Sequence, residues 1–309
     1  MRFTDWPLLI DAEALMQRLD DPDLRLFDCR FSLADTGAGL TAYRAGHLPG
    51  ARYAHLDEHL SSPIGLATGR HPLPDPQRLA DWLGRCGVGP RSRVVVYDDL
   101  SGAFAGRLWW LLRWIGHDIA ALLDGGLQAW TAAGGALSTD EPDIAPAALA
   151  AKPDDRLWID TADLAAAAAA CHDHAPVQII DARAPERFRG EQEPIDPVAG
   201  HIPGAINLPL TGNLEADGRF LPAAALRERF TAALGSRPPE QVAHSCGSGV
   251  NACHNLLAME LAGLPGSRLY AGSWSEWIRD PTRPVATDDR SAPRPRPAML
   301  PRITTRSPR

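Results

Sequence analysis

Short runs of continuously apolar residues alternate along the chain with longer runs whose apolar residues recur at helical spacing. In the first half this pattern predicts strands over Leu24 to Asp28, Arg93 to Asp98 and Ala120 to Leu123, and helices over Gln77 to Cys86 and Leu108 to Ile115. Strands that are apolar throughout, rather than at alternate positions, are typical of a parallel sheet with helices on both faces. The first half is therefore predicted to be an α/β unit.

The second half follows the same scheme. Strands are predicted over Val177 to Ile180, Gln241 to Ser245 and Ser267 to Tyr270, and helices over Leu226 to Leu234 and Asn251 to Ala262. Two successive α/β patterns in 309 residues indicate two domains of ordinary size.

Three sequence matches relate the halves in the same order. Leu26 to Arg30 matches Ile179 to Arg183, Gly46 to Ala51 matches Gly200 to Ala205, and Asp124 to Trp130 matches Ala271 to Trp277. The nearly constant offset is too long for a solenoid repeat, so we predict a duplicated domain. The G-H-[LI]-P-G-A hexapeptides are typical of turns. Because their histidines, His47 and His201, occur in both halves, we expect them to cap structure rather than catalyse.

The domain boundaries follow from shifts in composition. Residues 1–140 are expected to form the first domain and residues 157–285 the second. Residues 141–156, rich in Ala, Pro and Asp, are expected to link them. Residues 286–309 are rich in Pro and Arg with little to bury, which predicts a disordered tail.

Composition narrows the class of protein. A hydrophobic content of 45% and a charged content of 22% are typical of a soluble globular chain, and a net charge of −7 gives no reason to expect nucleic acid or a membrane as partner. Met1 to Leu15 carries acidic residues and no long apolar core, so we expect no signal peptide. Five cysteines without a C-x-x-C pair are typical of a reducing compartment, which predicts a cytoplasmic protein. Lys152 is the only lysine, so arginine or backbone N–H groups must hold an anionic substrate.

The stretch with the clearest chemistry is His244 to Ala252. A predicted strand ends in Cys246, a loop with two glycines follows, and a helix begins. Gly247 and Gly249 remove the Cβ where successive N–H groups can turn toward one point, and the helix N-terminus adds partial positive charge. Such a site stabilises an anion, so we expect the Cys246 thiolate to be favoured and to act as a nucleophile. A buried cysteine beside a glycine turn is the alternative that this loop alone leaves open.

Two classes of enzyme use a strand, a cysteine loop and a helix in this order. Cysteine phosphatases need an arginine six residues after the cysteine to hold the phosphoryl group, and here that residue is Ala252, which argues against phosphate ester cleavage. Cys246 to Ala252 reads C-G-S-G-V-N-A. It resembles the active loop of the rhodanese superfamily, and in particular C-G-S-G-V-T-A of 3-mercaptopyruvate sulfurtransferases, with Asn251 in place of threonine.

The resemblance covers about residues 6 to 280 and includes both hexapeptide turns. Arg107 to Arg113, R-L-W-W-L-L-R, is similar to the R-V-W-W-M-F-R of this family. Asp98 aligns with Cys246, as in two-domain sulfurtransferases whose N-terminal domain is inactive. The resemblance implies an α/β protein of two tandem rhodanese-like domains, each a central parallel sheet flanked by helices, of which only the second is catalytic.

The resemblance also implies the chemistry. The Cys246 thiolate takes sulfur from a donor, forms a persulfide and passes the sulfur to cyanide, a small thiol or a thioredoxin-like protein, without metal or organic cofactor. The anion is expected to bind the N–H groups of the loop, namely those of Gly247, Gly249, Val250, Asn251 and Ala252.

Members that use mercaptopyruvate relay a proton from a serine two residues after the cysteine to a histidine and an aspartate of the N-terminal domain. The matching residues are Ser248, His71 and Asp57. We therefore expect 3-mercaptopyruvate as the sulfur donor. Thiosulfate:cyanide transfer and a persulfide carrier without turnover are the alternatives.

Two arginines hold the carboxylate of the donor in those members. Arg187 matches the first, but Ile195 and Asp196 stand where the second is expected. Because of this departure, thiosulfate remains a close alternative to mercaptopyruvate as the donor.

Two smaller patterns have simpler explanations. Cys171-His172-Asp173-His174 is spaced like a metal site, but a polar helix end is the better interpretation because no fourth ligand is evident. Cys253 could resolve an oxidised Cys246, but a place in the core is the better interpretation.

Overall fold

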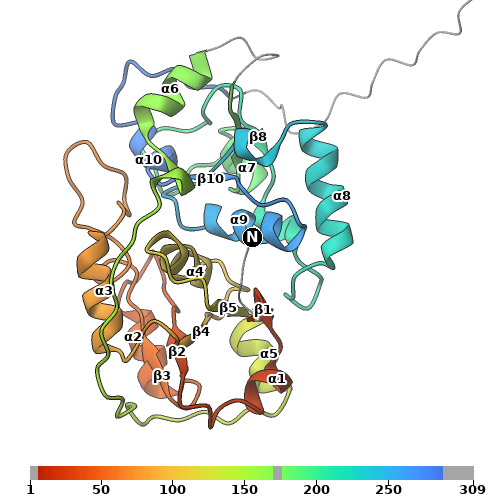
Figure 1. The fold of residues 1–309 in the computed structure, drawn as a ribbon. Helices are drawn as coiled ribbons and strands as arrows, with labels where there is room; N and C mark the ends of the chain where they lie inside the picture. Colours follow the sequence, from red (N-terminus) through yellow and green to blue (C-terminus); the bar gives the residue numbers. More distant parts are fainter. Residues whose placement is uncertain (1–5, 170–175, 288–309) are drawn as a thin grey trace, which may run out of the picture.

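The computed structural model describes residues 6–169 and 176–287 and contains two α/β units built on one plan (Figure 1). Each unit has a five-stranded sheet in which all paired strands are parallel. The strand order is β1-β5-β4-β2-β3 in the first sheet and β6-β10-β9-β7-β8 in the second. Because β1 to β5 correspond one by one to β6 to β10, the predicted duplication and fold class are confirmed.

The first unit contains the following elements in chain order: β1 Leu9–Ile10, α1 Ala12–Met16, β2 Leu24–Asp28, α2 Ala38–Ala45, β3 Ala51–Tyr53, α3 Pro76–Arg85, β4 Arg93–Tyr97, α4 Ala105–Trp114, β5 Ala120–Leu123 and α5 Gly126–Ala132. The second contains η1 Asp155–Leu157, β6 Trp158–Ile159, α6 Thr161–Ala169, β7 Gln178–Asp181, α7 Pro185–Phe188, β8 Ile206–Asn207, η3 Leu210–Asn213, α8 Ala223–Leu234, η4 Pro239–Gln241, β9 Val242–Ser245, α9 Ala252–Leu261, β10 Arg268–Tyr270 and α10 Ser273–Trp277. All the predicted strands and helices are present, with ends that differ by up to three residues. Most of the elements that the apolar pattern did not predict are short. Two or three residues are too few to show a periodicity.

Each sheet is covered by helices on both faces, as continuously apolar strands require. In β4, Val94 and Val96 pack with α3 and α4 in one apolar cluster, whereas Val95 and Tyr97 pack with α1 and α5 in another. In the second unit, Val242 of β9 shares its cluster with α8 and α9. Successive side chains of a strand thus point to opposite faces of the sheet and pack into two different apolar cores.

One of these cores continues from the first unit into the second, because α4 packs directly against α9 (Figure 1). A Cβ on Gly106 of α4 would lie 3.4 Å from the backbone nitrogen of His254 in α9, so the two helix backbones approach closely. Arg113 Nη1 of α4 and Glu260 Oε1 of α9 form an ion pair of 2.9 Å. The two units are therefore joined through the helices that follow β4 and β9.

The repeated D-x-R sequences perform the same structural task in both units. Arg30 Nη2 donates to Asp28 Oδ2 (2.6 Å) and to the Gly46 carbonyl (2.7 Å). In the second unit Arg183 Nη2 donates to Asp181 Oδ2 (2.7 Å) and to the Gly200 carbonyl (2.8 Å). Each arginine thus ties the end of a strand to the hexapeptide turn.

The hexapeptide histidines are structural. His47 Nδ1 lies 2.8 Å from the carbonyl of Tyr43 in the last turn of α2, and its ring stacks on Tyr43. His201 Nδ1 lies 2.7 Å from the carbonyl of Phe188 at the end of α7, and its ring stacks on Phe188. The capping interpretation is confirmed in both halves.

The predicted linker lies along the first unit. Residues 141–154 form no helix or strand. The Ala147 N–H donates to the Gly84 carbonyl (2.8 Å), and the Lys152 N–H donates to the Ile115 carbonyl (2.9 Å). Ala286, placed by the sequence at the start of the tail, exchanges hydrogen bonds with His201. The rest of that tail, from residue 288, lies outside the described residues. None of the helices in residues 6–169 and 176–287 is long and apolar enough to cross a membrane.

Candidate active site

Cys246 directly follows β9 at the carboxyl edge of the second sheet. Ser245 pairs with Asp181 of β7 in the register in which Tyr97 pairs with Asp28 of β2, so Asp98 and Cys246 occupy equivalent positions, as the repeat predicted. The Cys246 residue is only 2% exposed. Ser273 Oγ of α10 accepts a hydrogen bond from the Cys246 N–H at 3.0 Å and lies 4.0 Å from its Sγ.

The equivalent loop of the first unit binds an anion of its own. The buried Asp98 carboxylate accepts four backbone hydrogen bonds of 2.8–2.9 Å, from the N–H groups of Leu100, Gly102, Phe104 and Ala105. Burial raises the pKa of Asp98, and these four donors oppose the rise. In this arrangement of strand, loop and helix, several backbone N–H groups thus point toward one negative charge.

In the second unit the carbonyl groups of the loop are engaged by other elements. The Cys246 and Gly247 carbonyls accept from the Trp274 and Ser275 N–H groups, and the Gly249 carbonyl accepts from Arg107 Nη1 (3.0 Å). Each N–H that follows such a carbonyl points the opposite way, because the peptide unit is planar and trans. Among the described residues, the N–H groups of residues 247–251 have no acceptor, so they can serve an anion bound at Cys246.

Gly249 is required by the course of this loop. Its φ is +76°, and a Cβ on it would lie 2.2 Å from the carbonyl oxygen of Ala271. A side chain here would be strained and would also collide with the backbone before α10.

Ser248, His71 and Asp57 form a connected chain across the boundary between the units. Ser248 Oγ lies 2.7 Å from His71 Nδ1, and His71 Nε2 lies 3.3 Å from Asp57 Oδ1. An ionised Asp57 accepts from Nε2–H, which leaves Nδ1 of the neutral ring to accept the Ser248 hydroxyl proton. The structure thus brings together the three residues that the resemblance selected from distant positions.

The surroundings favour neutral His71. Burial lowers the pKa of His71, and Arg107 lowers it further, whereas the hydrogen bond to Asp57 raises it. The same hydrogen bond lowers the pKa of Asp57. Asp57 remains ionised and His71 uncharged near neutral pH, which is the state that can accept a proton.

Arg107 positions both the loop and the relay. This fully buried side chain donates from Nη2 to the His71 carbonyl (3.0 Å) and from Nη1 to the Gly249 carbonyl. The sequence marked Arg107 only as part of a run similar to the family. Arg107 lies among apolar residues of a helix whose other charged residue is Arg113, and a charged side chain in such surroundings could have indicated a buried structural role.

Two arginines approach the loop from opposite units. A Cβ on Gly247 would lie 2.9 Å from Arg70 Nη2 and 3.7 Å from Arg187 Nη1. Arg70 pairs through Nη1 with Asp196, and Arg187 pairs through Nη2 with Asp196 and Glu193. Sequence reasoning predicted Arg187 but missed Arg70, whose only local indication is its place directly before His71.

The segment in which the resemblance implied a second arginine contains none, as the sequence indicated. Ile195 of that segment is 42% exposed, whereas the Asp196 side chain is buried and turns toward the arginines. The loop of residues 69–71 brings a second guanidinium group, that of Arg70, next to Gly247. It is fixed to α10 by hydrogen bonds from the Gly69 N–H to Glu276 Oε2 and from the Arg70 N–H to Ser275 Oγ.

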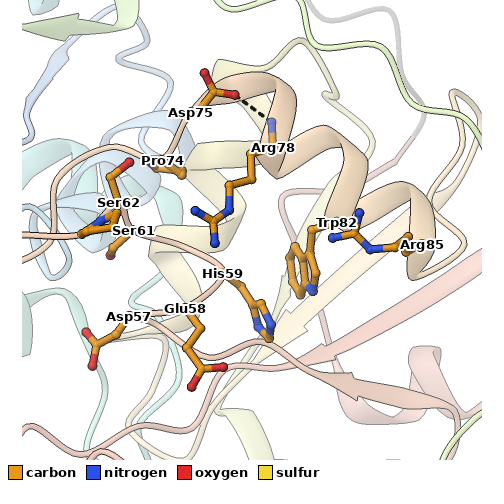
Figure 2. A pocket seen from close by; sticks show the side chains of 11 residues that line it. Asp57, Glu58, His59, Ser61, Ser62, Pro74, Asp75, Arg78, Trp82 and Arg85 are labelled. Atoms are coloured by element: carbon orange, nitrogen blue, oxygen red, sulfur yellow. Dashed lines mark hydrogen bonds between the residues drawn. The ribbon is translucent and has the colours of Figure 1, made fainter.

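A cavity of about 500 Å³ lies on the outer side of the relay (Figure 2). Asp57 and Glu58 line one side, and Arg78, Trp82 and Arg85 of α3 line the other. The Asp57 side chain is 41% exposed. The relay thus leads from the buried Ser248 to a carboxylate that meets solvent.

Of the two remaining candidates, the structure describes only Cys253. Cys253 is buried, its Sγ donates to the Gly249 carbonyl (3.4 Å), and burial raises its pKa to about 12, so its place in the core is confirmed. Cys171, His172, Asp173 and His174 lie outside the described residues. In residues 6–169 and 176–287 no group of three or more His, Cys, Asp or Glu side chains could hold a metal.

Two parallel α/β units, one with a buried aspartate in its loop and the other with a cysteine, define the class of two-domain rhodanese-like proteins. The rhodanese-like domain family matches residues 11–133 and 163–280, so the chain belongs to this family. Each matched range lies within one of the observed units and covers all of its sheet except the edge strand, β1 or β6.

Relatives named for either donor are similar to the chain. A probable 3-mercaptopyruvate sulfurtransferase of Pseudomonas aeruginosa is 53% identical over 91% of this chain and 98% of its own length. A putative thiosulfate sulfurtransferase of Mycobacterium tuberculosis is 41% identical over 90% of this chain and 96% of its own length. Among solved structures, 3-mercaptopyruvate sulfurtransferase from Leishmania major matches with a TM-score of 0.77 and 31% identity, covering 90% of this chain and 75% of that one.

Proposed function

We propose that the protein is a sulfurtransferase that takes sulfur from 3-mercaptopyruvate through a Cys246 persulfide and delivers it to a thiol or cyanide. The hydrogen-bonded chain of Ser248, His71 and Asp57, which begins two residues after Cys246, carries this proposal. The relative of Pseudomonas aeruginosa named for this donor adds support.

In the first half-reaction the Cys246 thiolate attacks the donor sulfur and forms the S–S bond of the persulfide. The C–S bond of mercaptopyruvate breaks, and its electron pair stays on the carbon as the enolate of pyruvate. The proton released by the Cys246 thiol ends on the methyl carbon of pyruvate. We assign this proton transfer to Ser248, with His71 as the base and Asp57 as its partner.

In the second half-reaction an acceptor thiolate or cyanide attacks the outer sulfur and releases the Cys246 thiolate. The N–H groups of Gly247 to Asn251, which have no acceptor among the described residues, stabilise the anionic sulfur before and after transfer. Arg70 and Arg187 hold the donor carboxylate next to Gly247. This chemistry needs no metal or organic cofactor. The four cysteines described are free thiols, which suits a cytoplasmic enzyme.

Thiosulfate is the second candidate donor. Its sulfonate can bind the same two arginines, and the Mycobacterium tuberculosis relative carries that name. A carrier without turnover has less support, because a carrier would not need the relay of Ser248 to Asp57.

Steady-state turnover with each donor, with cyanide as acceptor, tests the proposal. We expect a higher kcat/KM for mercaptopyruvate than for thiosulfate, and Cys246→Ser should abolish both activities and the added sulfur atom seen by mass spectrometry. Cys86→Ser, which changes another buried free thiol, should keep them. A preference for thiosulfate would contradict the donor assignment, and turnover by Cys246→Ser would contradict the nucleophile.

A further inference from the structure

Each of the two arginines beside the active loop, Arg70 and Arg187, binds a carboxylate through one of its terminal nitrogens and leaves the other terminal nitrogen without an acceptor among the described residues. Arg70 Nη1 binds Asp196, and Arg187 binds Glu193 (2.6 Å) and Asp196 (3.1 Å) through Nη2. Arg70 Nη2 and Arg187 Nη1 donate to no acceptor among the described residues, and both face Gly247. The carboxylates therefore leave a pair of donors directed at the residue next to Cys246.

The same carboxylates cancel the charge of the arginines. The side chains of Glu193 and Asp196 are only 4% and 2% exposed, and nearby Arg183 is paired with Asp181 (2.7 Å). Three guanidinium groups thus face three carboxylates, and the cluster has no net charge. An anion that binds there gains directed hydrogen bonds but little attraction from net charge.

We propose that Asp196 sets the preference for the sulfur donor by limiting the positive charge of the Arg70–Arg187 pair, so that the site favours a monoanionic donor over a dianionic one. This inference rests on the proposed function and concerns the choice within it. The carboxylate of mercaptopyruvate carries one charge, whereas thiosulfate carries two and costs more to desolvate. A site with net positive charge compensates that larger cost better than a neutral site does.

Asp196 acts here as a positioning residue. It belongs to the second unit, yet it binds Arg70 of the first, so one buried carboxylate aligns guanidinium groups from both units. Removing its charge should increase affinity for dianions, whereas a merely structural role predicts a loss of affinity for every ligand.

The test replaces Asp196 with the isosteric amide. In the Cys246→Ser background, which cannot turn over, Asp196→Asn should bind thiosulfate about 10-fold or more tightly by isothermal titration calorimetry. Affinity for pyruvate, a monoanion, should change by less than about threefold. With Cys246 present, the ratio of kcat/KM for thiosulfate to that for mercaptopyruvate should rise by about the same factor, mainly through KM.

Glu191→Gln is the matched control, because it removes one negative charge from the same segment and from a carboxylate paired with Arg189 rather than with Arg70 or Arg187. It should leave both affinities unchanged. If Asp196→Asn fails to fold, Asp196→Ser serves the same purpose. Unchanged or weaker thiosulfate binding in the folded variant would overturn the inference. Failure of the unmodified chain to use mercaptopyruvate would instead overturn the proposed function, and the binding experiment would still decide the role of Asp196.

Discussion

His71 lies between partners that shift its pKa in opposite directions. Burial and Arg107 lower the pKa, and Asp57 raises it, with a net decrease from the ordinary value. A ring that stays neutral to lower pH remains able to accept the Ser248 proton under mildly acidic conditions. The environment of one side chain thus sets the working range of the relay.

The pH profile should report this environment. Imidazolium cannot accept a proton, so kcat/KM with mercaptopyruvate should fall on the acid side with a midpoint below about 6.5. Asp57→Asn removes the group that raises the pKa of His71, so the midpoint should move to lower pH while kcat falls by roughly 10- to 100-fold. Glu58→Gln, on the same segment, should leave the midpoint in place. An acid limb above the ordinary histidine value would contradict a buried neutral base.

The sequence identified a site residue only where a short motif around that residue indicated its role. Cys246 follows from one contiguous loop, whereas Ser248, His71 and Asp57 follow from the resemblance. Arg70 could not be assigned, because its task is defined by Gly247 in the other half of the chain. A charged residue in a loop has no periodicity or spacing that reveals its distant partner.

At the scale of elements, the loops after β4 and β9 share one anion-binding geometry. The first loop contains an aspartate and the second a cysteine. Asp98 fills the first loop with its own carboxylate, whereas the N–H groups of the second loop, after Cys246, have no acceptor in the described part of the chain. The duplication therefore retained the anion-binding geometry in both units. Only the second unit can use it for transfer.

Two glycine substitutions in the active loop should separate folding from binding. Gly249→Ala must adopt a positive φ and meet the Ala271 carbonyl, so it should lower the free energy of unfolding by at least about 1–3 kcal/mol and abolish turnover. Gly247→Ala contacts the end of the flexible Arg70 side chain instead. It should change stability by less than about 0.5 kcal/mol and raise KM for mercaptopyruvate severalfold. Chemical denaturation and steady-state kinetics check both, and equal effects of the two substitutions would contradict this account.

At the scale of the whole molecule, the two units share a core. The apolar cluster that contains Val94 of the first sheet also contains Val242 of the second, joined through α4 and α9 (Figure 1). The relay and the arginine pair also cross this boundary. Separating the units would expose apolar surface and dismantle the site together.

The chain should accordingly unfold in one transition. Differential scanning calorimetry should give a single peak whose calorimetric and van't Hoff enthalpies agree, although two-domain proteins often deviate from this behaviour. Loss of Cys246 reactivity and loss of far-UV circular dichroism should coincide during denaturation. Two resolved transitions would show that the shared core does not couple the units.

The sequence by itself determined the type of the longer elements, the duplication and the cysteine loop. These depend on apolar runs, glycine positions and internal matches within short segments, which local physics fixes. The tertiary structure alone decided how His71 meets Ser248 across 177 positions, how Arg107 ties the His71 segment to the loop, and how Asp196 joins Arg70 to Arg187. These contacts arise from the close packing of α4 on α9 and of residues 69–71 on α10, and such packing depends on the shapes of surfaces that no single segment contains.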